Sequence, residues 1–213
     1  MAFTAATVWA CAAAAHRINE GYIKDDVWMM NATPPYIAKR TNKAVVKDML
    51  RTTNYSDLIE EDYVKGEEYR THFKGYAFLA IQGQLNDFQA QAFKIASKEE
   101  FTTRDMLDFA IVSCLPSVAE RDQDRNALKK EVYHSVQLES PEGSTIIAEM
   151  NVISCKFSST YNKYRVHGRI GESFVDFWAG FELVPGEDVK IKAKVKQHRG
   201  DKTTQINFVK KVK

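Results

Sequence analysis

The sequence of 213 residues is poor in cysteine, with only Cys11, Cys114 and Cys155, which are widely separated along the chain. No two of them have Cys-x-x-Cys spacing, and no cysteine and histidine stand at the spacing of a zinc site. An odd number of scattered cysteines does not suit a disulfide framework. We therefore expect three buried, free thiols in a reducing compartment.

The sequence also lacks an apolar run approaching the ~20 residues that a membrane-spanning helix needs. An alanine-rich stretch, AATVWACAAAAH, occupies residues 5–16, but no basic segment precedes it, as a signal peptide would require. We interpret the stretch as a helix of small residues. The prediction is a soluble, cytoplasmic protein with no membrane partner.

Motifs of common enzyme classes are absent as well: there is no GxxxxGKS/T phosphate loop, no GxSxG and no HExxH. Carboxylates gather in DLIEEDY (57–63), and Asp105 and Asp108 share one helix face, so a metal-dependent nuclease is an alternative. Successive acids, however, point around a helix into solvent, and Asp105 suits the first turn of a helix. We expect no catalytic residue, no metal and no cofactor.

Charge of one sign is not in excess over the whole chain, which has 30 Lys and Arg against 28 Asp and Glu. The distribution is uneven: residues 1–130 hold 17 basic and 18 acidic side chains, whereas from Val189 onward there are nine basic residues and one acidic residue. Positive charge concentrated at one end is typical of a surface that meets a polyanion.

The chain changes its pattern near residue 130. Residues 1–130 show helical spacing, as in the segment 69–95, where apolar residues recur at i, i+3 and i+4 with Gly75 and Gly83 as weak points. We predict a helical domain over 1–130. Its apolar side chains build a core, and those of DDVWMMNATPPY (25–36) offer an alternative role as a docking surface for a partner or a second copy.

Residues 131–213 follow the two-residue period of strands instead. Glycine-containing turns separate the expected strands, which are 131–139, 145–159, 164–170, 174–180, 189–196 and 203–212. The predicted fold class is α+β: a helical N-terminal part, then a small antiparallel barrel of five or six strands over 131–213.

The segment VKIKAKVK (189–196) alternates strictly. Its apolar residues fall on one face of a strand, and Lys190, Lys192, Lys194 and Lys196 fall on the other. Neighbouring like charges repel each other, so such a row indicates a negatively charged partner. The alternative is a solvated face that discourages sheet-to-sheet aggregation.

Two further strands combine aromatic and basic side chains. If Val175 and Phe177 are core residues, then Phe174 and Trp178 stand exposed beside the arginines of 164–170. Every base offers a π-face for stacking, and cations neutralise phosphates, so this combination suits single-stranded nucleic acid. The candidate binding residues are Tyr161, Arg165, His167, Arg169, Phe174, Trp178, Lys190, Lys192, Lys194, Lys196, His198 and Arg199.

The C-terminal third also shows a resemblance to a known class. It is carried by Gly168, Phe177-Trp178, Gly186-Glu187, Val195-Lys196-x-His198 and Gln205-Ile206-Asn207-x-Val209-Lys210. Over roughly residues 145–213 the sequence resembles OB-fold single-stranded-DNA-binding proteins of bacteriophage replication and recombination. The resemblance implies an OB-like barrel that binds single strands on strands 2 and 3 and in loops 1–2 and 4–5. Only a short turn, 180–188, replaces the helix of many OB folds, so another segment, such as the helical part, is expected to close the barrel.

The expected function is non-catalytic binding of single-stranded DNA in replication, recombination or repair, in a bacterial host if the chain is encoded by a phage. Nothing in the sequence distinguishes DNA from RNA. The helical part is expected to recruit another replication protein or to mediate self-association. Two alternatives stay open: an adaptor or inhibitor that uses the barrel as a scaffold, and a nuclease. If the outer face of the barrel is instead an interface within the chain, Phe174 and Trp178 pack beneath the N-terminal helices, and His167 and His198 are polar surface residues.

Overall fold

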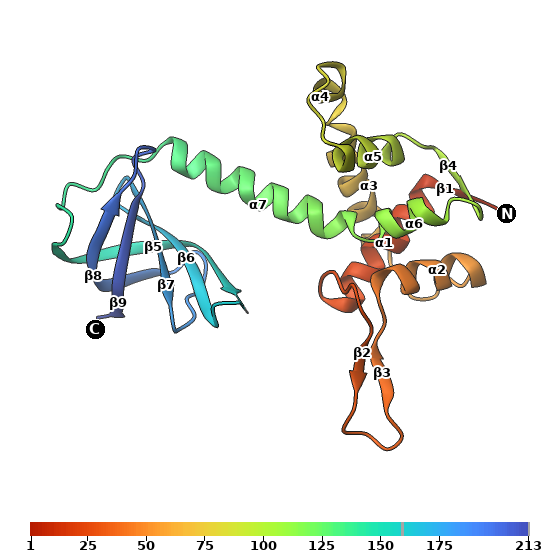
Figure 1. Ribbon diagram of the computed structural model, residues 1–213, viewed down its shortest axis with the longest axis horizontal. Coiled ribbons are helices and arrows are strands. Elements are labelled where there is room, and N and C mark those ends of the chain that lie inside the picture. Colours follow the sequence, from red (N-terminus) through yellow and green to blue (C-terminus); the bar gives the residue numbers. More distant parts are fainter. Residues whose placement is uncertain (159, 213) are drawn as a thin grey trace. The chain divides into compact units, whose positions relative to one another are not determined.

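The computed structural model describes residues 1–158 and 160–212. They form two compact units, Met1–Gln123 and Asp124–Lys213, and each is described by itself. The division lies within helix α7 (Leu115–Tyr133), and the predicted boundary near residue 130 lies further along the same helix. Figure 1 shows helices in the first unit and the barrel in the second.

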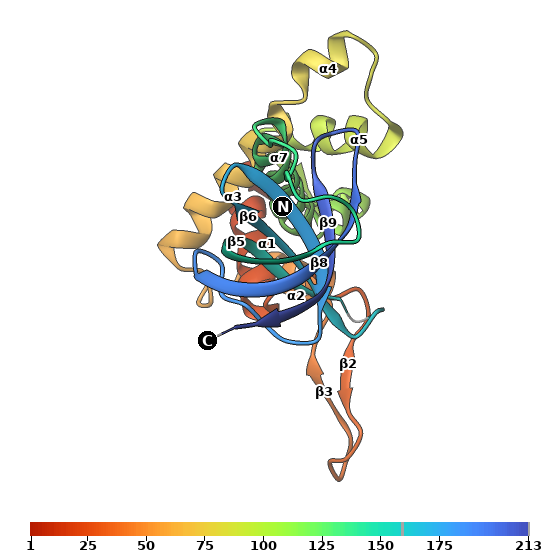
Figure 2. The same cartoon turned by 90° about the vertical axis from the view of Figure 1, so that its left-hand side faces the viewer.

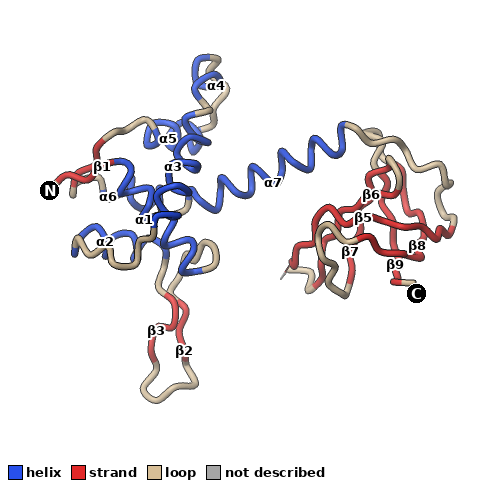
Figure 3. Tube along the Cα trace, turned by 180° about the vertical axis from the view of Figure 1, so that it is seen from behind, coloured by secondary structure: helices blue, strands red, loops and turns tan. Residues whose placement is uncertain are grey.

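The first unit is mainly helical (Figure 3). Its elements are β1 (Ala2–Thr4), α1 (Ala5–Asn19), β2 (Val27–Met29), β3 (Tyr36–Lys39), α2 (Asn42–Thr52), α3 (Glu60–Lys74), α4 (Ala77–Ile81), α5 (Asp87–Ala96), β4 (Glu100–Thr102), α6 (Met106–Val112) and the first part of α7. The segment 69–95, predicted as one helical stretch, is divided near Gly75 and Gly83, where α3 and α4 end.

Helix α1 lies at the centre of this unit, because its own small and apolar residues are buried on every side of the helix. Its alanines allow α3 to pack very closely: a Cβ atom on Gly66 would lie 2.7 Å from the backbone carbonyl carbon of Trp9. Cys11 is buried there, and burial raises the pKa of its thiol to about 12. All three cysteines are free, although Cys114 and Cys155 are only half-buried.

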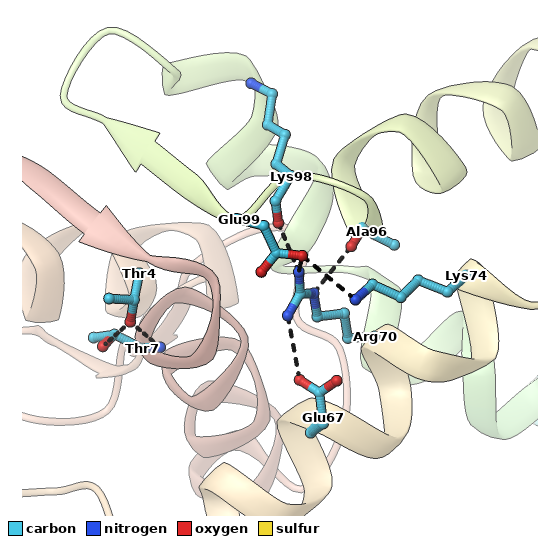
Figure 4. A network of polar contacts seen from close by, with 8 residues as sticks. All are labelled: Thr4, Thr7, Glu67, Arg70, Lys74, Ala96, Lys98 and Glu99. Atoms are coloured by element: carbon cyan, nitrogen blue, oxygen red, sulfur yellow. Dashed lines mark hydrogen bonds and ion pairs between the residues drawn. The ribbon is translucent and has the colours of Figure 1, made fainter.

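A buried arginine ties α3 to the connection between α5 and β4 (Figure 4). The Nε of Arg70 donates a hydrogen bond of 3.0 Å to the carbonyl of Ala96, and its Nη2 donates bonds of 2.8 Å to the carbonyl of Lys98 and to Oε1 of Glu99. The guanidinium is therefore satisfied without water, which a buried charge requires.

The second unit contains the barrel strands β5 (Thr145–Ser158), β6 (Lys163–Ile170), β7 (Ser173–Ala179), β8 (Asp188–His198) and β9 (Thr204–Lys211). Among the described residues they form a closed barrel in the order β5-β6-β7-β9-β8 (Figure 2). The predicted fold class, a helical part followed by a small barrel, is confirmed.

Two details of the prediction need correction. The barrel is mixed, because β7 and β9 pair in parallel whereas the other pairs are antiparallel. A closed ring of five strands cannot alternate in direction throughout, so one parallel pair is unavoidable. The strand expected at 131–139 is wrong: α7 continues to Tyr133, since NALKKEVY contains good helix formers that extend a helix already under way.

The barrel core confirms the alternation in β8. Val189, Ile191, Ala193 and Val195 are buried, and the four lysines between them are exposed. The core is completed from the turn 180–188, whose Leu183 is fully buried and donates its backbone N–H to Sγ of Cys155. The turn 180–188 therefore closes part of the barrel core, a role that we had expected another segment, such as the helical part, to fill.

Candidate nucleic-acid interface

Strand register places the candidate residues of β6 and β7 in rows on the outer surface of the barrel. Residues directly opposite each other on paired strands point to the same side of the sheet. One row is Lys156, Arg165 and Trp178, and the next is Ser154, His167 and Asp176. Val166 and Phe177, which alternate with these positions, are buried in the core, so both rows face outward.

Two aromatic rings and an arginine meet at one end of this surface. The rings of Tyr161, in the β5–β6 turn, and Trp178 lie 4.9 Å apart with an angle of 53° between their planes. The guanidinium of Arg165 lies 5.8 Å from the centre of the Trp178 ring. Trp178 is 37% exposed and Tyr161 64% exposed. We call these three residues the Trp178 cluster.

A buried carboxylate supports the cluster from the neighbouring row. Asp176 is only 3% exposed and accepts hydrogen bonds from Nη1 and Nη2 of Arg199, at 2.6 and 3.2 Å. Nη2 of Arg165 also lies 3.9 Å from Oδ2 of Asp176. One acid thus positions two arginines from different elements. Sequence reasoning missed this role of Asp176; the available signal was an acid between two outward aromatic positions, Phe174 and Trp178.

The two histidines are used within the fold. The Nδ1 atom of His167 lies 2.8 Å from Oγ of Ser154. Burial, helped by the nearby positive charge of Arg165, lowers the pKa of His167 below its usual value, so the ring is neutral at pH 7. His198 lies with Nδ1 3.0 Å from Oγ1 of Thr204 and Nε2 3.0 Å from the carbonyl of Ser140. Both rings therefore contact other atoms of the protein, and the neutral ring of His167 offers no positive charge to a phosphate.

The expectation that Phe174 stands exposed is wrong, since its side chain is only 4% exposed. The backbone N–H of Phe174 donates to Oγ of Ser135, and the N–H of Val136 donates to the carbonyl of Glu172. The residues that follow α7 therefore cover this end of the β6–β7 surface. Phe174 cannot stack on a base in this arrangement.

Arg169 lies at the same covered end. Its Nη2 donates to the carbonyl and to Oε2 of Glu131, at 3.2 and 2.6 Å. Its charge is therefore largely offset within the protein. Of the predicted β6 cations, Arg165 is the one that reaches solvent beside an exposed ring, with a side chain 51% exposed.

The lysines of β8 form a second basic surface. Among the described residues, none of Lys190, Lys192, Lys194 and Lys196 takes part in an ion pair, which leaves their charge available. Register adds Lys210 of β9, which lies opposite Lys192 and was not predicted. We call these five residues the lysine face.

Register also relates the lysine face to the Trp178 cluster. On β9, Gln205 pairs with Asp176 of β7 on one side and with Gln197 of β8 on the other. Lys196 adjoins Gln197 in the chain, at a point where the β8–β9 register shifts. The lysine face therefore begins at the sheet row that holds Asp176 and extends along β8 from there.

Over residues 1–158 and 160–212, no group of three or more His, Cys, Asp or Glu side chains has an arrangement that would hold a metal ion. None of the helices in these ranges is both long and apolar enough to cross a membrane. No family model, no curated protein and no solved structure matches this chain. A function is therefore inferred from the geometry of the barrel surface.

Proposed function

We propose that this protein binds single-stranded DNA on the outer surface of its barrel, as an OB-type, non-catalytic component of phage DNA replication, recombination or repair. The observation that carries the proposal is the Trp178 cluster: two exposed aromatic rings in contact, with a guanidinium over one of them. The cluster lies on the second and third barrel strands and the loop between the first two, where OB folds bind single strands.

Each residue of the cluster has a distinct part in this binding. Trp178 and Tyr161 supply π-faces that stack on successive bases without requiring a particular sequence. Arg165 holds a phosphate, and the carboxylate of Asp176, 3.9 Å from its Nη2, helps to keep the guanidinium over the face of the Trp178 ring. Because this contact is electrostatic, we expect affinity to fall as the salt concentration rises.

The lysine face extends the site for the DNA backbone. Its five ammonium groups occupy two adjacent strands, β8 and β9, and single-stranded DNA bound at the Trp178 cluster continues toward them across the row of Asp176, Gln205 and Gln197. Lysines contribute charge without reading sequence. The proposed site therefore combines a short stacking platform with a longer phosphate track.

The decisive test is a salt titration of binding to a fluorescently labelled oligothymidylate, with Trp178→Ala compared with the wild type. Loss of one stacking partner costs about 1–3 kcal/mol, so the Kd should rise about 5- to 150-fold. Phe78→Ala is the control, since it removes an exposed aromatic ring from the first unit and should leave the Kd unchanged.

Failure to bind at low salt would contradict the proposal and favour the adaptor alternative. An equal loss in Trp178→Ala and Phe78→Ala would also contradict it, because the effect would then not be specific to the cluster. Competition with an unlabelled oligouridylate of the same length establishes whether RNA binds as well. Incubation of the labelled DNA with Mg²⁺ or Mn²⁺ tests for cleavage, as a nuclease would require.

A further inference from the structure

A bulge in β9 sets Phe208 outside the barrel core. Lys192 and Lys194 of β8 are two residues apart, and each has a partner on β9. These partners, Lys210 and Asn207, are three residues apart, so β9 contains one residue more than β8 between the same two pairs. The extra residue of a bulge has no partner across the sheet, and bulges often redirect a side chain next to a binding site.

The side chains around the bulge show which residue is the extra one. Ile206 is buried, and Val209 packs against the same core. Phe208 is 76% exposed. By strict alternation from Ile206, Phe208 would point inward and Val209 outward, so the bulge exchanges the sides of these two residues. A large apolar ring therefore stands in solvent while a smaller apolar side chain takes its place in the core.

The backbone of Phe208 is strained at this position. Its φ is 53°, in the left-handed region, where bulky side chains are rarely found. A common type of bulge has glycine there for this reason. Among the described residues, the other non-glycine residues with positive φ lie at helix ends or in turns, whereas Phe208 lies inside a strand. Strained residues of this kind cluster at ligand-binding and active sites.

The surroundings of the ring are basic. The outward row on one side of Phe208 is Ile147, Lys192 and Lys210, and the row on the other side is Thr145, Lys194 and Asn207. Neither row contains an acid. The next row along β8 pairs Lys190 with Glu149, so the acid lies beyond the rows that flank the ring. A partner that combines planar apolar groups with negative charge fits this surface.

Single-stranded nucleic acid combines these two properties, since its bases offer π-faces and its phosphates are anionic. No other ring and no cation among the described residues stacks on Phe208, so the ring is open to a base. We propose that Phe208 stacks on a base of the bound strand, which makes the lysine face a second stacking site as well as a phosphate track. This role of Phe208 rests on the proposed function.

Phe208 lies toward the same end of the barrel as the Trp178 cluster. Strands β7 and β9 pair in parallel at Asp176 and Gln205. Trp178 follows that row by two residues on β7, and Phe208 follows it by three residues on β9. Because parallel strands run in the same direction, both rings lie on the same side of the row. A nucleic-acid strand that leaves the Trp178 cluster across β9 therefore meets Phe208 and the lysines beside it.

The test is binding of a labelled oligothymidylate to the full-length protein, with Phe208→Gly and Phe208→Leu compared with the wild type. Both variants lack the aromatic face, so the Kd should rise about 5- to 150-fold. The slope of log K against log salt should stay unchanged, because no phosphate contact is lost. Phe208→Tyr keeps the ring and should bind like the wild type. Phe78→Leu is the matched control, since it replaces a phenylalanine of the first unit that is 67% exposed.

Urea unfolding separates the two consequences of the bulge. Glycine adopts a positive φ without strain, so Phe208→Gly should keep or raise the urea midpoint while it weakens binding. Circular dichroism confirms that the variants are folded.

The outcomes distinguish this role from the proposed function. If the wild type binds but Phe208→Gly and Phe208→Leu bind equally well, the role of Phe208 is overturned and the proposed function stands. A similar loss in Phe78→Leu, or a smaller salt slope in Phe208→Leu, also overturns the stacking role, since the effect would then not come from the ring on this surface. A wild type that fails to bind at low salt overturns the proposed function and the role of Phe208 with it.

Discussion

Arg199, in the β8–β9 turn, donates two hydrogen bonds to the carboxylate of Asp176 on β7, with N···O distances of 2.6 and 3.2 Å. The carboxylate of Asp176 is almost fully buried, whereas the guanidinium of Arg199 is about one third exposed. A single acid therefore fixes the turn to the sheet and reduces the positive charge of the proposed binding surface. Stability and the proposed DNA binding therefore place opposite demands on this residue.

Substitution Asp176→Asn tests that opposition. The amide keeps the size of the side chain and one acceptor oxygen but leaves Arg199 without its counter-charge, so we expect a loss of about 1–3 kcal/mol in the free energy of unfolding. The same change raises the net positive charge of the surface, so binding to single-stranded DNA should be tighter at low salt and fall more steeply with added salt. Urea unfolding and a salt titration measure the two effects. Weaker binding by a folded Asp176→Asn variant would show that positioning of Arg165 by the carboxylate outweighs the gain in net positive charge.

The lysine face gives a second prediction, about its place in the site. The double substitution Lys192→Gln and Lys194→Gln should reduce the slope of log K against log salt by about 0.7 for each phosphate that is no longer neutralised. Little change in stability is expected, because both side chains are exposed and unpaired with acids in the described structure. Lys43→Gln, on α2 in the first unit, is the control for general charge. An unchanged slope would place the phosphate track elsewhere.

His167 predicts a pH dependence of stability. Its pKa in the folded state is lowered, mainly by burial, so the unfolded chain binds more protons than the folded chain between the folded pKa and the usual value of about 6.5. The contribution of His167 is therefore fully present above pH ~6.5 and decreases as the pH falls toward the folded pKa.

The measurement is the denaturant midpoint between about pH 7.5 and about pH 5, with His167→Asn compared with the wild type. The denaturant midpoint of the wild type should fall between neutral and acidic pH, and the midpoint of His167→Asn should fall by less. His134→Asn, at an exposed position, should behave as the wild type does. An identical pH profile for His167→Asn and the wild type would mean that the ring titrates equally in both states.

Gly66 gives a test of the helical unit. Alanine normally stabilises a helix interior relative to glycine, by up to about 1 kcal/mol. Here a Cβ atom would lie 2.7 Å from the carbonyl carbon of Trp9, which is backbone and cannot rotate away. We expect Gly66→Ala to destabilise the protein by about 1–3 kcal/mol, as seen for overpacked interiors, in thermal or urea unfolding. Gly180→Ala is the control, because no atom lies within 4 Å of its added Cβ; a neutral Gly66→Ala would show that α1 and α3 separate easily.

Several features were predictable because they are local. The alternation of VKIKAKVK sets which side chains of β8 enter the core, whatever the strand's neighbours are. Thr41 precedes α2 and accepts a hydrogen bond from the N–H of Ala44, which is the local preference of threonine at the start of a helix. The exposure of Trp178 beside Arg165 also followed from the period of two, once Val175 and Phe177 were assigned to the core.

Other features depend on segments that meet only after folding. Phe174 occupies the same outward register as Trp178, yet Ser135 and Val136, some forty residues earlier in the chain, cover it. Ser135 and Val136 reach β7 because α7 continues to Tyr133 and the chain then passes over β7. The alternating pattern of 131–139 had instead predicted a strand. Asp176 became a site residue only because a distant turn brings Arg199 to it.

The order of amino acids alone determined the two-part architecture, the positions of the five barrel strands and their inward and outward faces, since these follow from backbone periodicity and turn chemistry within a few residues. Tertiary structure decided which outward positions remain open to a ligand, because exposure depends on what other segments pack against a face. It also decided how much of each arginine's charge is left for a partner, since that depends on acids that are distant in the chain and adjacent in space.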